Sequence, residues 1–445
     1  MPTHWEKIRN FLLYLFVFLI PLQTVYILAE RVIGGRKWQY GTMVIYATEI
    51  LLWAIVIIQL WLLFKRHGFH FKIKLQLLEK RKRFLLIIGL WLLIAWSGLS
   101  IFWSSDQTLS VYYWFKLLEA LAFFMVVITS NFDKIKMYWA LALAGLLEGL
   151  TANLQFFKQE VVSNKLLGVA EHLPSIVGDS LVEYQGLWLR AYGHFSHPNI
   201  LAGFLVLCFF VVLFLYLKEE PIFDRFLSPL QAVIMLVIAS GIFFSFSRSA
   251  WLALILSYLF LLVSFKIKKV TVDWRQLSKI TAYLFLLGLV ISIIYQPFIF
   301  NRLSAQNNLE DISLNRRVKL LNQTYGIIGE KPLVGVGLGS YTSEIFQDYA
   351  GVSASENQPV HNLYLLITAE LGLVGLAIFL FIVISVWRLA AQEGNYLFCS
   401  LIIAFLVIGF FDHYLWTQYS GLIIFWLTLA LALKTKSYES LDSKH

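Results

Sequence analysis

The stretch that decides the fold spans nine residues, Lys331-Pro332-Leu333-Val334-Gly335-Val336-Gly337-Leu338-Gly339. It lies within residues 298–372, the longest part of the chain that is too polar to cross a lipid bilayer. Its glycines lack the strand-to-helix setting of a nucleotide-binding loop, and no Lys-Ser or Lys-Thr pair follows them. They therefore predict a tight turn that leads the chain back to a membrane, which it re-enters at His361.

Apolar residues dominate the rest of the chain. Of the 445 residues, 59% are hydrophobic and 14% are charged, against about 25% charged in soluble domains. A helix needs about 20 apolar residues to cross a bilayer. We therefore predict an all-α, polytopic membrane bundle of about twelve transmembrane helices, which forms a single membrane domain over residues 1–445. The expected spans are 11–30, 41–64, 84–102, 112–130, 137–157, 198–217, 229–247, 249–265, 280–297, 361–386, 395–411 and 419–433.

The basic residues predict the orientation of the bundle. The formal net charge is +9, and membrane proteins concentrate Lys and Arg in cytoplasmic loops. The basic loop 65–83 and both termini are then cytoplasmic, whereas residues 158–197 and 298–360 face outward, the latter as a large helical loop before the tenth helix. By the same rule, the expected partner of the basic loop is membrane lipid and not nucleic acid. We expect a multi-pass protein of the cytoplasmic membrane.

The first outward segment ends at a candidate anion site. Arg190, His197 and Asn199 lie beside Pro198, which suits the first turn of the following helix. Free N–H groups and the helix dipole favour an anion at such a position. His194 and His197 have a spacing that could suit a metal, but no acidic cluster or third ligand lies near them in sequence. We therefore expect no metal and no cofactor.

Further candidates lie on the outward side of later segments. Arg248 lies in a polar break between two apolar runs, where it either contacts headgroups or points inward at a phosphate. Arg317 and Leu321 are four residues apart and share the apolar face of a predicted helix. Arg316 is rotated from Arg317 by about 100° and is expected to face solvent. His361 begins a span, where a lone histidine is more often a packing or interface residue than a base.

Five motifs occur in order along the chain. They are Arg190-…-Gly193-…-Pro198-Asn199, Ser247-Arg248-Ser249-Ala250, Arg317 with Leu321, Pro332 to Gly339, and His361 with Gly372. With these motifs the chain resembles the superfamily of O-antigen ligases and O-antigen polymerases, which are polytopic bacterial membrane glycosyltransferases. The core O-antigen ligase-like region spans about 186–375 and includes the outward segment 298–360.

The resemblance implies a metal-independent, inverting glycosyltransferase with its active site on the extracytoplasmic face of the membrane. Its substrate is a glycan on undecaprenyl diphosphate, which is transferred to an acceptor hydroxyl during lipopolysaccharide or polysaccharide biosynthesis. The diphosphate-binding arginines correspond to Arg190, Arg248 and Arg317, and the general base corresponds to His361. The family has a single arginine at this position, whereas this chain has two adjacent ones, Arg316 and Arg317. Which of the two corresponds to the family's arginine stays open, and Arg317 is preferred. Arginine forks suit phosphate oxygens, and a near-neutral histidine can accept a hydroxyl proton.

The acceptor and the reaction class stay open. A glycolipid acceptor would make the chain a ligase, a growing glycan would make it a polymerase, and a protein hydroxyl would make it an O-oligosaccharyltransferase. A lipid-linked glycan flippase or other transporter is the alternative from another class, and a non-catalytic scaffold is a third. A transporter is expected to distribute charged residues through many spans. Here the candidates cluster at outward ends, which favours the enzyme.

Overall fold

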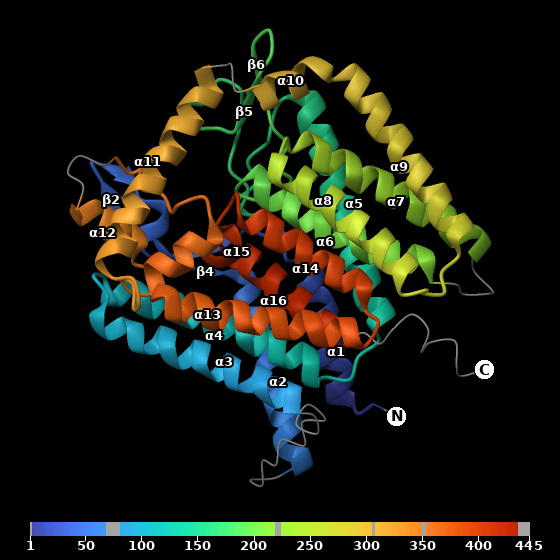
Figure 1. The fold of residues 1–445 in the computed structure, drawn as a ribbon, viewed down its shortest axis with the longest axis horizontal. Helices are drawn as coiled ribbons and strands as arrows, with labels where there is room; N and C mark the ends of the chain where they lie inside the picture. The colour runs from blue at the N-terminus through green and yellow to red at the C-terminus, as the bar shows by residue number, and fades with distance from the viewer. Residues whose placement is uncertain (1, 68–80, 219–223, 305–307, 349–352, 435–445) are drawn as a thin grey trace.

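The computed structural model describes residues 2–67, 81–218, 224–304, 308–348 and 353–434, and most of them are helical (Figure 1). Each predicted span overlaps an apolar helix. These helices are α1 (His4–Phe18), α2 (Ala47–His67), α3 (Arg81–Leu99), α4 (Gln107–Thr129), α5 (Lys134–Lys158), α6 (Pro198–Leu217), α7 (Asp224–Phe244), α8 (Arg248–Ile267), α9 (Trp274–Ile294), α13 (Leu363–Gln392), α14 (Tyr396–Gly409) and α16 (Tyr419–Lys434).

Shorter elements connect these helices. The polar helices of the segment predicted to face outward are α10 (Gln296–Ser304), α11 (Asn308–Glu330) and α12 (Tyr341–Asp348), and α15 (Tyr414–Thr417) follows α14. Two 3-10 turns are η1 (Gln39–Gly41) and η2 (Ser100–Trp103). The strands are β1 (Val25–Ala29), β2 (Val32–Ile33), β3 (Arg36–Lys37), β4 (Met43–Tyr46), β5 (Leu181–Glu183) and β6 (Leu187–Leu189), paired antiparallel as β1–β4, β2–β3 and β5–β6.

Within the described ranges, eight helices are long and apolar enough to cross a membrane, namely α2 to α6, α8, α9 and α13. Helices α7, α14 and α16 supply shorter apolar stretches. The chain is therefore a polytopic helical membrane protein. The total of twelve spans stays a prediction, because α1, with 15 residues, is about 23 Å long and a bilayer core is about 30 Å thick.

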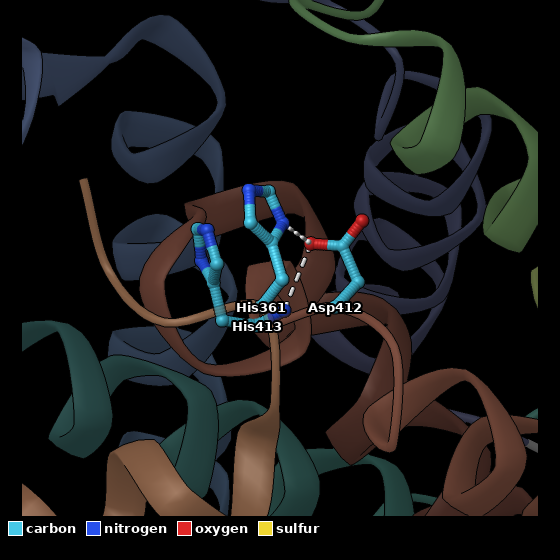
Figure 2. Close-up of side chains that lie close together, drawn as sticks. All are labelled: His361, Asp412 and His413. Atoms are coloured by element: carbon cyan, nitrogen blue, oxygen red, sulfur yellow. Dashed lines mark hydrogen bonds and ion pairs between the residues drawn. The ribbon is translucent and has the colours of Figure 1, made fainter. Parts of the chain in front are cut away.

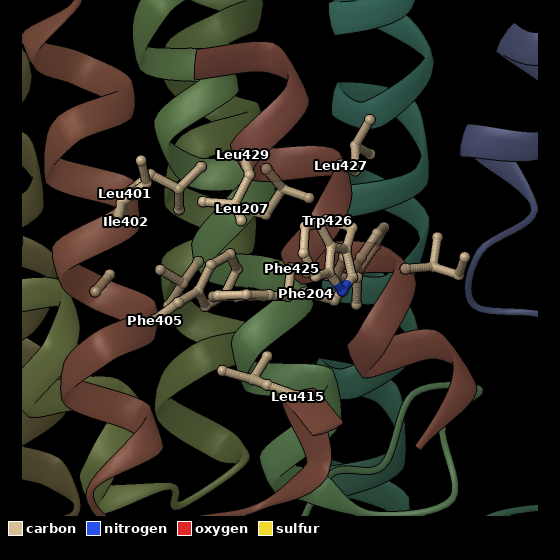
Figure 3. Close-up of a cluster of buried hydrophobic side chains, with 14 of the residues drawn as sticks. Phe204, Leu207, Leu401, Ile402, Phe405, Leu415, Phe425, Trp426, Leu427 and Leu429 are labelled. Carbon is tan, nitrogen blue, oxygen red and sulfur yellow. The ribbon is translucent and has the colours of Figure 1, made fainter. Parts of the chain in front are cut away.

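Helix α6 lies at the centre of the bundle and is buried along nearly its whole length. It packs against α5, α7, α8, α14 and α16. Figure 3 shows Phe204 and Leu207 of α6 beside Phe405 of α14 and Phe425 of α16. A helix that is apolar on every side is stable where other helices surround it. This central helix also begins at Pro198, so the core of the bundle positions the candidate anion site.

The first predicted span, residues 11–30, is displaced in the structure. Helix α1 ends at Phe18, and Val25 begins β1, in which it pairs with Tyr46 of β4. The helix does not continue through Pro21, because proline cannot donate the backbone hydrogen bond of a helix interior. Beyond it, β-branched residues such as Ile27 suit a strand. The prediction of an all-α fold is corrected accordingly to a mostly helical fold with small two-stranded sheets.

Contacts at the two ends of α4 show where the chain termini lie relative to the polar helix α12. At its C-terminal end, the Ser130 carbonyl accepts a hydrogen bond from Lys434 Nζ of α16 at 2.6 Å. At its N-terminal end, Asp106 accepts a hydrogen bond from Ser343 Oγ of α12 at 3.3 Å. Because the 23 residues of α4 span about 35 Å, α16 ends on the opposite side of the bundle from α12, and α1 begins there too (Figure 1). Most of the predicted loop 65–83 lies outside the described residues.

The glycine-rich stretch docks onto a break in α13. Gly372 interrupts this helix with φ 70° and ψ −178°, a conformation that glycine adopts almost alone. The backbone groups around the break pair with the docked stretch. Val336 N donates to the Ala369 carbonyl, and Leu373 N donates to the Pro332 carbonyl, both at 2.9 Å. The unwound turn of a membrane helix thus satisfies its hydrogen bonds inside the protein.

This docking leaves no room for larger residues at either glycine position. A Cβ added at Gly372 would lie 2.0 Å from the Leu333 carbonyl oxygen, and one at Gly335 would lie 2.4 Å from the Glu370 carbonyl carbon. Two of the five sequence motifs are therefore one structural unit. The prediction of a turn is confirmed, but the chain also passes through α12 before it reaches His361.

Candidate functional site

His361, Asp412 and His413 come together from two distant segments (Figure 2). His361 precedes Asn362, the N-cap of α13, and the other two lie between α14 and α15. His361 Nδ1 lies 3.7 Å from Asp412 Oδ1, and the backbone N–H of His413 donates to the same oxygen at 2.8 Å. The two imidazole rings are 5.2 Å apart between centroids. Asp412 and His413 are buried.

A chain of hydrogen bonds joins this cluster to Arg190. Asp412 Oδ2 accepts a hydrogen bond from Asn199 Nδ2 at 2.6 Å, and Asn199 Oδ1 accepts one from Arg190 Nη2 at 2.7 Å. Arg190 is only 5% exposed, and its Nε donates to the Ser245 carbonyl at 2.7 Å. The structure thus connects three sequence candidates, Arg190, Asn199 and His361, through Asp412.

His197 caps α6 beside this chain. Its Nδ1 accepts a hydrogen bond from Asn199 N at 3.1 Å, which satisfies a free donor of the first helical turn. Burial lowers the pKa of His197 to about 3, and the nearby charge of Arg190 adds to the shift. The ring is therefore neutral at pH 7. His194 faces another partner, Glu148 Oε1 of α5, at 2.7 Å, so the two histidines do not converge on one metal site.

The carboxylate of Asp412 lies among histidine rings. Burial alone would raise the pKa of the Asp412 carboxyl. The surrounding histidine rings, led by His361, outweigh burial and hold this pKa below the usual range of a carboxyl. Burial lowers the pKa of His413 to about 3, against the opposing charge of Asp412. Asp412 is therefore the negative group of the site, and His413 is a neutral neighbour.

The remaining predicted arginines have different surroundings. Arg248 begins α8, and its Nη1 donates to the Arg302 carbonyl of α10 at 2.8 Å. Ser245, which binds Arg190, lies in the turn between α7 and α8, and Arg248 directly follows this turn. The turn therefore positions both Arg190 and Arg248. Arg317 is half-buried on α11, whereas Arg316 is exposed. The charge of Arg317 also contributes to the lowered pKa of His413, after burial. Arg317 is thus less exposed than Arg316, as predicted, and the roles of both arginines stay predictions.

Residues 232–380 match a family model described as O-antigen ligase. This part of the chain is similar to the O-antigen ligase family. This match confirms the resemblance drawn from the five motifs, and it contains Arg248, Arg317 and His361. Among curated proteins, none matches the chain. The similarity to this superfamily supports glycosyl transfer at a membrane, with a lipid-linked glycan and an acceptor as substrates in general.

The cluster around His361 extends beyond the matched stretch. Arg190 precedes it and Asp412 follows it, yet both belong to the chain of contacts that ends at His361. Asp412 and His413 carry no motif of their own, and the sequence candidates do not include them. A signal was present, because an ionisable pair interrupts the apolar residues between 395 and 433.

The same cluster is a candidate metal centre. One ligand atom each from His361, Asp412 and His413 lie within 4.8 Å of one another. His413 Nδ1 already lies 2.8 Å from Thr417 Oγ1, and Asp412 Oδ2 already accepts from Asn199. A cation bound here would share the imidazoles of His361 and His413 and the carboxylate of Asp412 with these hydrogen bonds. The expectation of a metal-independent site stays a prediction.

Proposed function

We propose that the chain transfers a glycan from undecaprenyl diphosphate to an acceptor hydroxyl, on the outer face of the cytoplasmic membrane, without a metal and with inversion. The observation that carries this proposal is the chain of hydrogen bonds from Arg190 through Asn199 to Asp412, whose other carboxylate oxygen faces His361. A cation for the leaving diphosphate and a base for the attacking hydroxyl thus belong to one connected cluster.

His361 has the surroundings that a general base needs. Its Nδ1 is buried and makes no hydrogen bond of normal geometry within the described chain, but the anionic Asp412 lies beside it at 3.7 Å. This charge favours the tautomer with the proton on Nδ1, which leaves Nε2 to accept a proton from the acceptor hydroxyl. The acceptor oxygen then attacks the anomeric carbon, and the bond to the diphosphate oxygen breaks. A single displacement of this kind inverts the anomeric centre.

The arginines stabilise the diphosphate as it leaves. Arg190 is held in place by the Ser245 carbonyl and the Asn199 amide, so little reorganisation is needed when a phosphate binds. Its burial strengthens the interaction, because charges attract more strongly where water is excluded. Arg248 and Arg317 add positive charge from α8 and α11. Guanidinium forks match phosphate oxygens in geometry as well as in charge.

A transfer assay with purified protein tests the proposal. The donor is a glycan on undecaprenyl diphosphate, and glycolipid, glycan and protein acceptors are offered in parallel, with and without EDTA. We expect one acceptor class to gain the glycan at the same rate in both conditions. Loss of transfer in EDTA, restored by a divalent cation, would contradict the metal-free mechanism and favour a cation on Asp412. Movement of the donor across vesicles without transfer would favour a flippase.

A further inference from the structure

A partly open cavity lies next to the candidate site, between the outer ends of α4 and α16 and under the β1–β4 hairpin. Its volume is about 470 Å³, within the range of about 300–1,000 Å³ that is usual for small-molecule sites. We call it the tyrosine cavity. Its aromatic lining consists of Tyr40, Tyr46, Tyr112, Tyr113, Trp416 and Tyr419.

These rings offer flat apolar faces with polar groups at their edges. Tyr46 and Tyr419 are stacked, with centroids 4.8 Å apart and an interplanar angle of 19°. The Tyr419 hydroxyl is buried and makes no hydrogen bond of normal geometry within the described chain. Burial raises the pKa of Tyr46 to about 12, yet its side chain keeps accessible surface. Tyr46 lines the cavity and is available there to a ligand.

The tyrosine cavity has little charge to offer a phosphate. Its inner cation, Lys116, forms ion pairs with Glu49 at 2.5 Å and with Glu119 at 3.7 Å. The other lysine of the lining, Lys37, is exposed. The remaining polar groups are neutral hydroxyls and amides, such as the side-chain amide of Gln418. Neutral donors and acceptors around aromatic faces match a sugar, which has apolar C–H faces and a rim of hydroxyls.

The cavity also adjoins the candidate base. Thr417 lines it, and its Oγ1 lies 2.8 Å from His413 Nδ1. Tyr40 lines it too and packs edge-on against His413, with 5.6 Å between ring centroids. Because the rings of His413 and His361 are 5.2 Å apart, one side chain separates the cavity from the base. Arg190 approaches the cluster through Asn199 and the other oxygen of Asp412.

From this geometry we infer that the tyrosine cavity is the acceptor subsite and that the acceptor is a carbohydrate. This inference rests on the proposed transfer reaction. The diphosphate of the donor binds among the arginines, and the acceptor sugar stacks on the tyrosines with one hydroxyl directed past His413 to His361. The inference selects a glycan or glycolipid acceptor over a protein hydroxyl.

Binding measurements on the full chain test this inference independently of transfer. The probes are lipid-free oligosaccharides released from the surface glycans of cells that express the chain, with a serine-rich peptide for comparison, and the readout is saturation-transfer NMR. Tyr46→Ala removes a stacking face, and Val44→Trp fills the cavity that Val44 lines. Tyr26→Ala is the matched control, because Tyr26 lies in the same hairpin but is 72% exposed. Thermal unfolding checks that each variant is folded.

We expect oligosaccharide binding to weaken about tenfold in Tyr46→Ala, to disappear in Val44→Trp and to persist in Tyr26→Ala. Binding of the lipid-linked donor should be unchanged in all three variants. Oligosaccharide binding that survives in folded Tyr46→Ala and Val44→Trp, or binding of the peptide alone, would overturn the inference. Failure of the proposed function would appear differently, as saccharide binding at the cavity without any transfer from the donor.

Discussion

The position of Arg190 is determined by the groups that it hydrogen-bonds. Its guanidinium binds the Ser245 carbonyl on one side and Asn199 on the other, and the side chain is almost fully buried. A buried arginine is stable only where its donors are satisfied. The same partners orient its positive charge toward the cluster around Asp412, so the residue is positioned before substrate binds.

Arg317 and Arg316 provide a matched pair of substitutions on one helix. We predict that Arg317→Ala weakens binding of the lipid-linked donor about 10- to 100-fold, because a charged hydrogen bond to phosphate contributes about 1.5–3 kcal/mol. Arg316→Ala should leave donor binding within about twofold, because its side chain is exposed. Donor affinity is measured for both variants in the same detergent. The reverse pattern would contradict the assignment made from the helical face.

His197 should make stability depend on pH. Unfolded histidine binds a proton below about pH 6.5, whereas folded His197 stays neutral down to about pH 3. Its contribution to stability is therefore complete above pH 6.5 and is lost as the pH falls toward 3. His197→Asn keeps a capping side chain but removes this titration. We expect its thermal midpoint to fall less steeply than that of the wild type between pH 6.5 and 4, and equal slopes would contradict the account.

At the scale of the elements, the break in α13 and the docked glycine-rich stretch depend on each other for their backbone hydrogen bonds. The break at Gly372 exposes backbone groups, and residues 332–339 supply their partners. A membrane helix can therefore be interrupted here without leaving polar groups unpaired.

Gly372→Ala tests this unit. The new Cβ would lie 2.0 Å from the Leu333 carbonyl oxygen, and the residue would have to keep a positive φ. We expect a loss of about 2–4 kcal/mol in the free energy of unfolding, together with reduced transfer. Gly329→Ala is the control, because a Cβ there meets open space. Equal stability of the two variants in thermal unfolding would show that the docking contributes little.

The sequence predicted the helices well because apolar runs of membrane length leave few alternatives. It misplaced the first span because apolar residues such as Val25 and Ile27 suit a strand as well as a helix. The link through Asp412 could not be predicted, because it depends on a contact between residues 213 positions apart. The prediction that Arg317 is less exposed than Arg316 was correct, because helical periodicity determines which side chain faces the protein.

For the whole molecule, the predicted orientation has a direct test. The native thiols, Cys208 and Cys399, are buried, so a membrane-impermeant thiol reagent should leave them unlabelled. We expect Ser355→Cys, an exposed position before His361, to be labelled in intact spheroplasts. Lys7→Cys, exposed at the start of α1, should be labelled only after permeabilisation. Labelling of Lys7→Cys in intact spheroplasts would contradict a cytoplasmic N-terminus.

The measurement that tests the central claim most directly is transfer by His361→Ala, compared with donor binding by the same variant. We predict that transfer falls by about 100- to 10,000-fold, the contribution expected of a general base, while affinity for the lipid-linked donor stays within about twofold, because the arginines are intact. Asn362→Ala, which removes the cap of α13 and a hydrogen bond to the Phe410 carbonyl, controls for disturbance of the helix start. Normal transfer by a folded His361→Ala variant would contradict the account.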